Sequence, residues 1–295
     1  MSVDLVVVGL GYVGLPLVEA ATLSGLDVVG LDVSSRIVDG LNAGISHVDD
    51  ISDQQVRELL ERGFRATSDP SVISIASVVV ICVPTPLGSE GGPDLTYVLS
   101  AANSIGKYLV SGQLVVLEST TYPGTTDEEL RPILETLSGL TAGEDFSLAF
   151  SPERIDPGNP VYGIRNTPKV VGGHTPNCTT RAANFYRQFI DDVFQARGTR
   201  EAEMTKLLEN TYRQVNIGLM NEMVQFCHRL GIDLWDVVEL AKTKPFGFQA
   251  FYPGPGVGGH CIPIDPMYLS YNVRARLGAP SLFIETAQAV NNGMP

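Results

Sequence analysis

The sequence has no long hydrophobic run. None of its apolar stretches approaches the roughly 18 residues that a membrane-spanning helix needs. Met1 leads at once into a β-branched segment, without the basic region and cleavage site of a secretory signal. We therefore expect a cytoplasmic protein that does not bind membranes.

Basic residues and cysteines are also scarce. Twenty Lys and Arg residues stand against 33 Asp and Glu residues, a formal net charge of −13, which argues against general attraction to nucleic acid. The four cysteines are Cys82, Cys178, Cys227 and Cys261, which are far apart and form no CxxC pair. This usage fits a reducing compartment better than a disulfide framework or a zinc site, so we expect no metal.

Short β-branched apolar runs alternate with segments of helical periodicity through residues 1–198, which is the pattern of a parallel sheet with crossover helices. The predicted strands are 4–8, 28–32, 78–83, 114–118, 146–150 and 169–172. The predicted helices are 13–24, 35–43, 53–62, 95–107, 127–136 and 177–189. Because the strands are apolar throughout, both faces of the sheet should be covered. The sequence thus predicts an α/β fold with a Rossmann-like, doubly wound parallel sheet in this first domain.

The last hundred residues have a different pattern. Residues 200–230 have helical spacing without proline, which predicts one helix of about 30 residues, or about 45 Å at 1.5 Å per residue. Asp233 is placed to cap a shorter helix, and the Pro- and Gly-rich residues 244–266 predict a loop. A helix of this length suggests a spine shared by domains or subunits. We assign residues 199–295 to an α-helical domain that forms a homodimer through this central helix.

Directly after the first predicted strand, the sequence reads GxGxxG. The segment consists of Gly9, Leu10, Gly11, Tyr12, Val13 and Gly14, and an acidic residue, Asp32, ends the next strand. In dinucleotide-binding sheets the first glycine permits a tight turn, the second lets the backbone approach the pyrophosphate, and the third lets helix and strand pack closely. Asp32 would accept hydrogen bonds from the adenosine ribose and repel a 2′-phosphate, so the sequence predicts NAD rather than NADP.

Two further segments follow predicted strands, at the edge where such sheets bind ligands. Val83, Pro84 and Thr85 follow the third strand, and Ser119 and Thr120 follow the fourth. We expect both segments to contact the cofactor. For the prolines alone, a rigid turn is an equally good explanation.

The last cysteine lies in a loop of unusual composition. Glycines and prolines crowd residues 253–259, immediately before His260 and Cys261, and Asp265 follows four positions after the cysteine. A cysteine among flexible backbone amides with a carboxylate nearby suits a thiolate nucleophile. A buried structural cysteine is the alternative. One His beside one Cys has no metal-ligand spacing, so we expect packing or substrate contact for His260.

Three polar residues are further candidates. On the predicted long helix, Lys206 and Asn210 are four positions apart and therefore on one face. Together they can donate hydrogen bonds to an oxygen that gains negative charge, although a solvated helix face is the alternative. Glu153 follows the fifth predicted strand and is a candidate base or water-orienting group, with capping or a surface ion pair as the alternative.

Taken in order, these segments resemble the nucleotide-sugar 6-dehydrogenases, the UDP-glucose/GDP-mannose dehydrogenase family. The resemblance covers the whole chain and rests on six ordered segments: Gly9 to Gly14, Val83 to Pro86, Ser119 and Thr120, Ser151 to Glu153, Lys206 to Asn210, and Gly258 to Cys261 followed by Asp265. Residues 151–158 and 244–248 look most like the branch that acts on UDP-N-acetylglucosamine or UDP-N-acetylmannosamine. UDP-glucose enzymes usually differ after the Pro-Glu pair.

The resemblance implies an enzyme that oxidises C6 of a UDP-sugar from alcohol to carboxylate, with two NAD reduced, for surface polysaccharide precursors. In that mechanism, Cys261 would form a thiohemiacetal and then a thioester, while Lys206 and Asn210 would stabilise the charged oxygen. The implied proton-handling groups are Asp265, Glu153 and a water near Thr120. The implied substrate contacts are Glu153, Arg154, Lys206, Asn210, Gly258 and Gly259.

The chain departs from this family in length. Members typically run on into a second Rossmann-like domain that binds the nucleotide of the substrate, and this chain stops at residue 295, where that connection would begin. We therefore expect the UDP-binding domain to be missing and the chain to be weakly active or inactive. The alternatives are a UDP-glucose or other nucleotide-sugar dehydrogenase, a two-electron 3-hydroxyacid-type dehydrogenase that would not need Cys261, and a non-catalytic module that binds NAD and dimerises.

Overall fold

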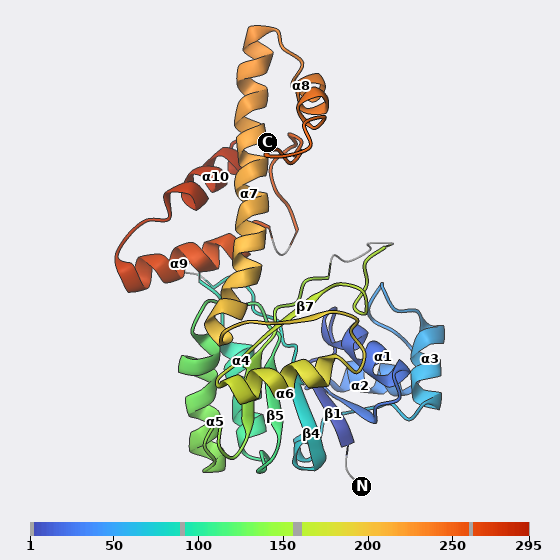
Figure 1. The fold of residues 1–295 in the computed structure, drawn as a ribbon. Coiled ribbons are helices and arrows are strands. Elements are labelled where there is room, and N and C mark those ends of the chain that lie inside the picture. Colours follow the sequence, from blue (N-terminus) through green and yellow to red (C-terminus); the bar gives the residue numbers. More distant parts are fainter. Residues whose placement is uncertain (1–2, 89–91, 156–160, 260–261, 295) are drawn as a thin grey trace. The chain divides into compact units, whose positions relative to one another are not determined.

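The computed structural model describes residues 3–88, 92–155, 161–259 and 262–294 (Figure 1). The chain divides into two compact units. The first contains Met1–Pro86 and Asp94–Lys206, and the second contains Leu87–Pro93 and Leu207–Pro295. The division falls within a single long helix, so this helix belongs to both units.

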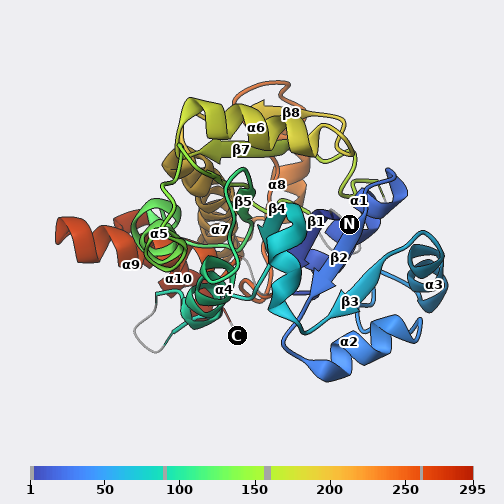
Figure 2. The same cartoon turned by 90° about the horizontal axis from the view of Figure 1, so that it is seen from below.

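The first unit is built on an eight-stranded sheet. Its strands are β1 (Val3–Val8), β2 (Val28–Leu31), β3 (Arg65–Thr67), β4 (Ala76–Ile81), β5 (Leu114–Leu117), β6 (Ser147–Phe150), β7 (Lys169–Gly173) and β8 (Val193–Gln195). Their order is β3-β2-β1-β4-β5-β6-β7-β8, and Figure 2 shows β3, β2, β1 and β4 side by side. On β1, Val7 is in register with Gly30 of β2 and with Val80 of β4. In this order the chain adds strands on both sides of β1, which confirms the predicted doubly wound sheet.

Two features of the sheet differ from the prediction. The three-residue strands β3 and β8 are partly exposed and too short to produce an apolar run, and they were not predicted. The prediction of a wholly parallel sheet was wrong at β7, which pairs antiparallel with β6. The described residues between these two strands contain no crossover helix, so the chain turns back along β6.

Helices connect the strands of the first unit. They are α1 (Gly14–Leu23), α2 (Ser35–Asn42), α3 (Asp53–Glu61), α4 (Thr96–Gly106), α5 (Arg131–Ser138) and α6 (Pro176–Tyr186), with a 3-10 turn η1 (Pro70–Ile75) and a π-helical turn η2 (Thr125–Leu130). Ser34 and Thr175 cap α2 and α6, and Ser52 forms a capping box with Gln55 on α3. One helix predicted over 127–136 is instead η2 followed by α5, and Pro132 stands in the first turn of α5.

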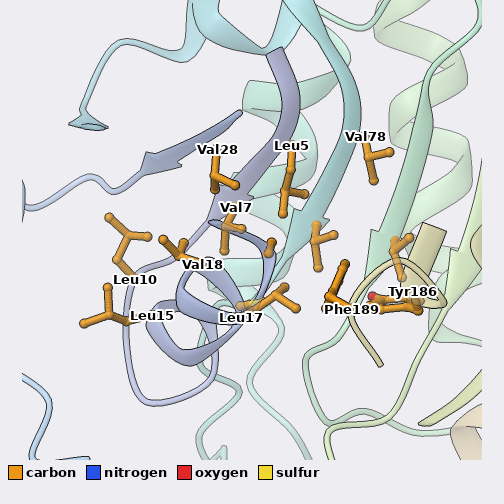
Figure 3. Close-up of a cluster of buried hydrophobic side chains, with 14 of the residues drawn as sticks. Leu5, Val7, Leu10, Leu15, Leu17, Val18, Val28, Val78, Tyr186 and Phe189 are labelled. Atoms are coloured by element: carbon orange, nitrogen blue, oxygen red, sulfur yellow. The ribbon is translucent and has the colours of Figure 1, made fainter. Parts of the chain in front are cut away.

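The sheet is buried on both faces. Leu5 and Val7 of β1 belong to a cluster with α1 and α6, whose members include Leu15, Leu17, Val18, Tyr186 and Phe189 (Figure 3). Val6 and Val8, which alternate with them, belong to the cluster with α4 and α5. The continuous apolar strands of the sequence therefore correspond to a sheet covered on both sides.

The second unit is helical. It contains most of α7 (Thr199–Leu230), together with α8 (Leu234–Ala241), α9 (Asp265–Leu277) and α10 (Leu282–Asn292). The single helix predicted over 200–230 is confirmed, as is Asp233 as a cap, since its carboxylate accepts from the Trp235 N–H at 3.0 Å. The prediction of a loop through residue 266 was wrong at its end, because Asp265 begins α9. Pro266 follows in the first turn, where its missing N–H leaves no helix hydrogen bond unmade.

Gly218 explains how α7 and α10 pack. A Cβ atom at this position would lie 3.2 Å from the Ala287 Cα, so a larger residue would push α10 away. Side-chain amides extend the contact, as the Asn221 amide donates to the side-chain oxygen Oδ1 of Asn291 at 2.8 Å. None of the helices in the described residues combines the length and the hydrophobicity of a membrane-spanning segment.

Candidate active site

The sheet of the first unit gathers the predicted cofactor residues at one edge. β1, β2, β4, β5 and β6 run parallel, so the residues that follow them lie at the same edge. The chain order reverses between β1 and β4, and ligands of doubly wound sheets bind outside the carboxyl ends of the strands at such a switch point.

The three glycines of the fingerprint meet different local requirements. Gly9 has φ 92°, and a Cβ there would lie 2.8 Å from the Cys82 carbonyl oxygen. A Cβ at Gly14 would lie 1.9 Å from the Gly9 carbonyl oxygen, so helix and turn are in direct backbone contact. A Cβ at Gly11 would meet nothing within 4 Å. The turn is therefore tight on the protein side and open at its middle glycine.

The surroundings of this turn suit a dinucleotide. Val13 at the start of α1 makes no side-chain capping hydrogen bond, which leaves the helix N-terminus suited to a phosphate. Asp32 accepts from the Leu10 N–H and from the Ser34 N–H, both at 2.9 Å, so its carboxylate is fixed after β2. Tyr12, within the glycine turn, is exposed. The residues present thus fit a bound dinucleotide.

The loops after β4 and β5 are joined by two hydrogen bonds. The Ser119 hydroxyl donates to the Val83 carbonyl at 2.6 Å, and the Thr85 hydroxyl donates to the Thr120 carbonyl at 2.7 Å. Pro84, between the two bonded residues of its loop, is exposed. The predicted residues of the two loops are therefore connected to each other by hydrogen bonds, next to the glycine turn.

Lys206 lies next to Thr120 in the structure. Its ammonium group donates to the Thr120 hydroxyl at 2.7 Å, and both residues are half-buried. The pair belongs to the first unit, because Lys206 is the last residue assigned to it. The loop after β5 thus brings a hydroxyl and a cation together at the cofactor edge.

A second residue of α7, Glu203, also holds this loop and was not predicted. Its carboxylate is 1% exposed and accepts from the Gly124 N–H at 2.6 Å, from the Thr126 N–H at 2.9 Å and from the Thr126 hydroxyl at 2.7 Å. Burial raises the pKa of Glu203 to about 7. The only signal in the sequence is a carboxylate three positions before Lys206 on the same helix.

Glu153 is buried, and the alternative of a surface ion pair was wrong. Its carboxylate lies 3.6 Å from the Lys169 ammonium and accepts from the Ile155 N–H at 2.6 Å. The neighbouring Arg154 was predicted to bind substrate. In the structure its guanidinium donates to the Pro168 carbonyl at 2.6 Å, which is a contact within the protein.

Lys169 is a functional candidate that was not predicted. The signal for it in the sequence is a lysine at the start of an apolar strand.

Asn210 and Asp265 form a pair in the second unit. The Asn210 amide donates to the Asp265 carboxylate at 2.6 Å, and Asp265 is buried at the start of α9. Gly258 and Gly259 are exposed, with φ 83° at Gly259. His260 and the predicted nucleophile Cys261 lie outside the described residues.

The three described cysteines are free and buried. Burial raises the pKa of the Cys82 thiol well above its ordinary value, and the Thr175 hydroxyl lies 3.1 Å from the Cys178 sulfur as its donor. A neutral, enclosed thiol is a poor nucleophile. No group of three or more His, Cys, Asp or Glu side chains in the described residues could hold a metal ion.

The doubly wound sheet, the open glycine turn and Asp32 define a protein that binds a dinucleotide. Two family models match the chain: the NAD binding domain of the UDP-glucose/GDP-mannose dehydrogenase family at residues 3–190, and the central domain of the same family at residues 200–293. The chain therefore belongs to the UDP-glucose/GDP-mannose dehydrogenase family. This result confirms the predicted resemblance, the NAD cofactor and the class of enzyme.

Relatives with assigned activities cover nearly the whole chain. A UDP-N-acetyl-D-mannosamine dehydrogenase of Pyrococcus horikoshii is 37% identical over 291 residues, which are 98% of this chain and 68% of the relative. A UDP-N-acetyl-D-glucosamine 6-dehydrogenase of Pseudomonas aeruginosa is 39% identical over 290 residues, 98% of this chain and 67% of the relative. The solved structure of a UDP-D-ManNAc dehydrogenase from Pyrococcus horikoshii has a TM-score of 0.91 at 37% identity and covers 99% of this chain and 69% of that chain.

Proposed function

We propose that the protein catalyses the NAD-dependent, four-electron oxidation of C6 of a UDP-N-acetylhexosamine from alcohol to carboxylate. The observation that carries this proposal is the hydrogen bond between Lys206 and Thr120 at the edge of an NAD-binding sheet. It supplies a cation and a hydroxyl where an alcohol must lose a proton and a hydride. The product class suits the synthesis of precursors for surface polysaccharides.

The residues of the glycine turn hold the cofactor. Gly11 would offer open backbone to the pyrophosphate, the N-terminus of α1 would donate N–H groups to it, and Asp32 would accept from the adenosine ribose. Val83, Thr85 and Ser119 line the same edge. When bound, each of two successive NAD molecules supplies an acceptor for one hydride.

In the first oxidation, the sugar alcohol becomes an aldehyde. The C6 hydroxyl loses its proton as hydride leaves the carbon, so negative charge develops on the oxygen. Lys206 and Asn210 donate hydrogen bonds to that oxygen, and the proton passes to a water near Thr120, to Glu153 or to Asp265. These residues are assigned roles by their chemistry and by the family motifs in which they stand.

The second oxidation needs a covalent step. The Cys261 thiolate attacks the aldehyde carbon, forming a C–S bond while the carbonyl oxygen takes up a proton, which gives a thiohemiacetal. Loss of a second hydride and of the hydroxyl proton gives a thioester. Water then adds to the thioester carbon, the C–S bond breaks, and the carboxylate and the free thiol are released. Glu153 is the group proposed to take the proton of this water.

The choice of an acetamido sugar rests on two segments. Residues 151–158 and 244–248 resemble the branch acting on UDP-N-acetylglucosamine or its manno epimer, and relatives of both names cover nearly the whole chain. The alternative substrate is UDP-glucose or another nucleotide sugar.

A panel of nucleotide sugars tests the proposal. UDP-N-acetylmannosamine, UDP-N-acetylglucosamine, UDP-glucose and GDP-mannose are each incubated with NAD at high protein concentration, so that weak turnover is still measured. We expect two NADH per acetamido sugar and less product from the other sugars. NAD binding without NADH from any sugar would support the non-catalytic module instead, and one NADH per sugar would contradict the thioester route.

A further inference from the structure

A buried cluster of charged groups lies behind Glu153. Glu118 follows β5, Glu153 follows β6, Lys169 opens β7, and Tyr186 ends α6. All four side chains are buried, with exposures of 1%, 8%, 5% and 0%. Charged side chains are rarely buried unless they are paired, so their arrangement calls for a physical explanation.

Lys169 is shared between the two carboxylates. Its ammonium lies 3.1 Å from Oε2 of Glu118 and 3.6 Å from Oε2 of Glu153. The Tyr186 hydroxyl donates to Oε1 of Glu118, and the ammonium stands 5.1 Å from the centre of the Tyr186 ring. One cation therefore serves two anions, and each carboxylate competes with the other for it.

Three contacts hold residues 151–154 against the first residues of β7 and the residue that precedes it. The Ser151 hydroxyl donates to the Val170 carbonyl at 2.8 Å, and the Arg154 guanidinium donates to the Pro168 carbonyl at 2.6 Å. The ion pair between Glu153 and Lys169 lies between these two contacts in sequence on both segments. Oε1 of Glu153 accepts from the Ile155 N–H at 2.6 Å, whereas the buried Oε2 accepts no hydrogen bond among the described residues and has the Lys169 ammonium as its ion-pair partner.

We propose that Lys169 is a positioning residue of the reaction: its ammonium holds the Glu153 carboxylate in place, while Glu118 competes for the same cation. This inference rests on the proposed function, in which Glu153 takes up a proton from water. Lys169 itself acts only through Glu153.

The groups that face Lys169 from every neighbouring element support this assignment. Burial raises the pKa of Glu118, although the Lys169 ammonium opposes the effect. Burial alone would lower the pKa of Lys169, but the Glu118 and Glu153 carboxylates raise it above its ordinary value. Two more groups face Lys169: Tyr186 at the end of α6 and Cys82, the residue after β4. Burial raises the pKa of both. The ammonium of Lys169 therefore keeps its charge, and the phenol and the thiol stay neutral.

The test compares two substitutions that should act in opposite directions. Lys169→Met removes the cation and should move the pH dependence of the Glu153 NMR signal and of kcat to higher pH, whereas Glu118→Gln removes the competing anion and should move both to lower pH. Shifts of about one to three pH units are expected for a charge at this distance. Lys169→Arg retains the charge and should stay near the parent. Lys107→Met, at an exposed lysine after α4, is the matched surface control and should change nothing.

Two readouts separate this inference from the proposed function. The first is ¹³C NMR of protein labelled at the Glu Cδ, in the absence of sugar, with the Glu153 signal assigned by its loss in Glu153→Gln. The second is the acid limb of the pH profile of kcat for NADH formation. Opposite shifts in both readouts would support the inference. An unmoved Glu153 signal, or shifts in one direction for both variants, would overturn it.

Two further outcomes are also decisive. A Glu153 signal that moves without the acid limb of kcat would contradict the proposed role of Glu153, and with it the catalytic part of this inference, while the influence of Lys169 on the Glu153 carboxylate would stand. If Lys169→Met does not fold, the double variant with Glu118→Gln removes one cation and one anion together. Because the double variant lacks the cation that Glu118→Gln retains, its Glu153 NMR signal should change at a higher pH than in Glu118→Gln. A change at a lower pH than in Glu118→Gln would contradict the inference.

Discussion

The Lys206 ammonium donates a hydrogen bond to the Thr120 hydroxyl across 86 residues of sequence. Lys206 is on α7, and Thr120 is in the loop after β5. Glu203, one turn earlier on α7, holds the same loop through Gly124 and Thr126. The first turns of α7 thus determine where the Thr120 hydroxyl lies.

Thr120→Val should reduce kcat for NADH formation by about 10- to 100-fold. The substitution keeps the shape of the side chain but removes the acceptor of the Lys206 hydrogen bond, and a bond to a charged group contributes roughly 1.5–3 kcal/mol. Thr120→Ser keeps the hydroxyl and is the control. Equal rates for the valine and serine variants would show that the hydroxyl is not required.

Asp32→Asn should weaken the preference for NAD over NADP by about tenfold or more. The substitution removes the negative charge that would face a 2′-phosphate, and repulsion of about 1.4 kcal/mol corresponds to a factor of ten. Asparagine keeps an acceptor for one of the two N–H groups of Leu10 and Ser34, so the loop is less disturbed than by alanine. Both cofactors are titrated by fluorescence. NADP binding as tight as NAD in the parent protein would refute the prediction.

Cys261→Ser should separate the two oxidations. Serine is a far poorer nucleophile near neutral pH, so NADH per sugar should fall from two toward one or less, while the aldehyde-forming step continues at a reduced rate. Mass spectrometry of the parent protein during turnover should find the sugar on Cys261. Cys227→Ser, at a buried cysteine of the helical unit, is the control. A sugar trapped on Cys82, Cys178 or Cys227 would identify a different nucleophile.

Glu203→Gln should change how stability depends on pH. The pKa of Glu203 is raised from 4.5 to about 7 in the folded protein, so the folded state binds more protons than the unfolded state between these values. The contribution of this group to the free energy of unfolding is therefore greatest below about pH 4.5 and is lost as the pH rises through 7. The loss is at most about 3 kcal/mol for a shift of about 2.5 pH units.

The glutamine variant lacks this ionisation. Relative to the parent, its free energy of unfolding in urea should improve by up to about 3 kcal/mol between pH 5 and pH 8, whatever the fixed cost of the changed hydrogen bonds. Glu144→Gln, at an exposed carboxylate, should give a curve parallel to the parent. Parallel curves for Glu203→Gln as well would show that Glu203 is not buried as described.

We expect the chain to form a homodimer through α7. Six large hydrophobic side chains of the helix are exposed: Leu208, Tyr212, Leu219, Met223, Phe226 and Leu230. An exposed apolar row of this kind favours association.

Light scattering at micromolar concentration tests the dimer. Leu219→Glu should raise the dissociation constant by about tenfold or more, because it places a charge in an apolar contact. Gln225→Glu adds the same charge at an exposed position of α7 six residues away, on another side of the helix, and should leave the dimer intact. A strictly monomeric parent protein would contradict this prediction.

The sequence by itself determined the fold class, the cofactor and the family. Apolar strands that alternate with amphipathic helices have a period that local physics sets, and the fingerprint from Gly9 to Gly14 followed by Asp32 needs only short-range geometry. The 32-residue helix was predictable for the same reason, since no proline interrupts its spacing. The short strands β3 and β8 were not, because three partly exposed residues carry no pattern of their own.

Only the tertiary structure decided which polar groups meet. Glu153, Lys169 and Glu118 come from three segments that the sheet brings side by side, and Glu203 reaches the loop after β5 from 77 residues away. The burial of these groups, and the pKa changes of Glu118, Lys169 and Glu203, depend on neighbours that are distant in sequence, so no local spacing could have indicated them. The antiparallel return of β7, which places Lys169 beside Glu153, likewise follows from the path of the chain between two strands and not from the residues of either strand.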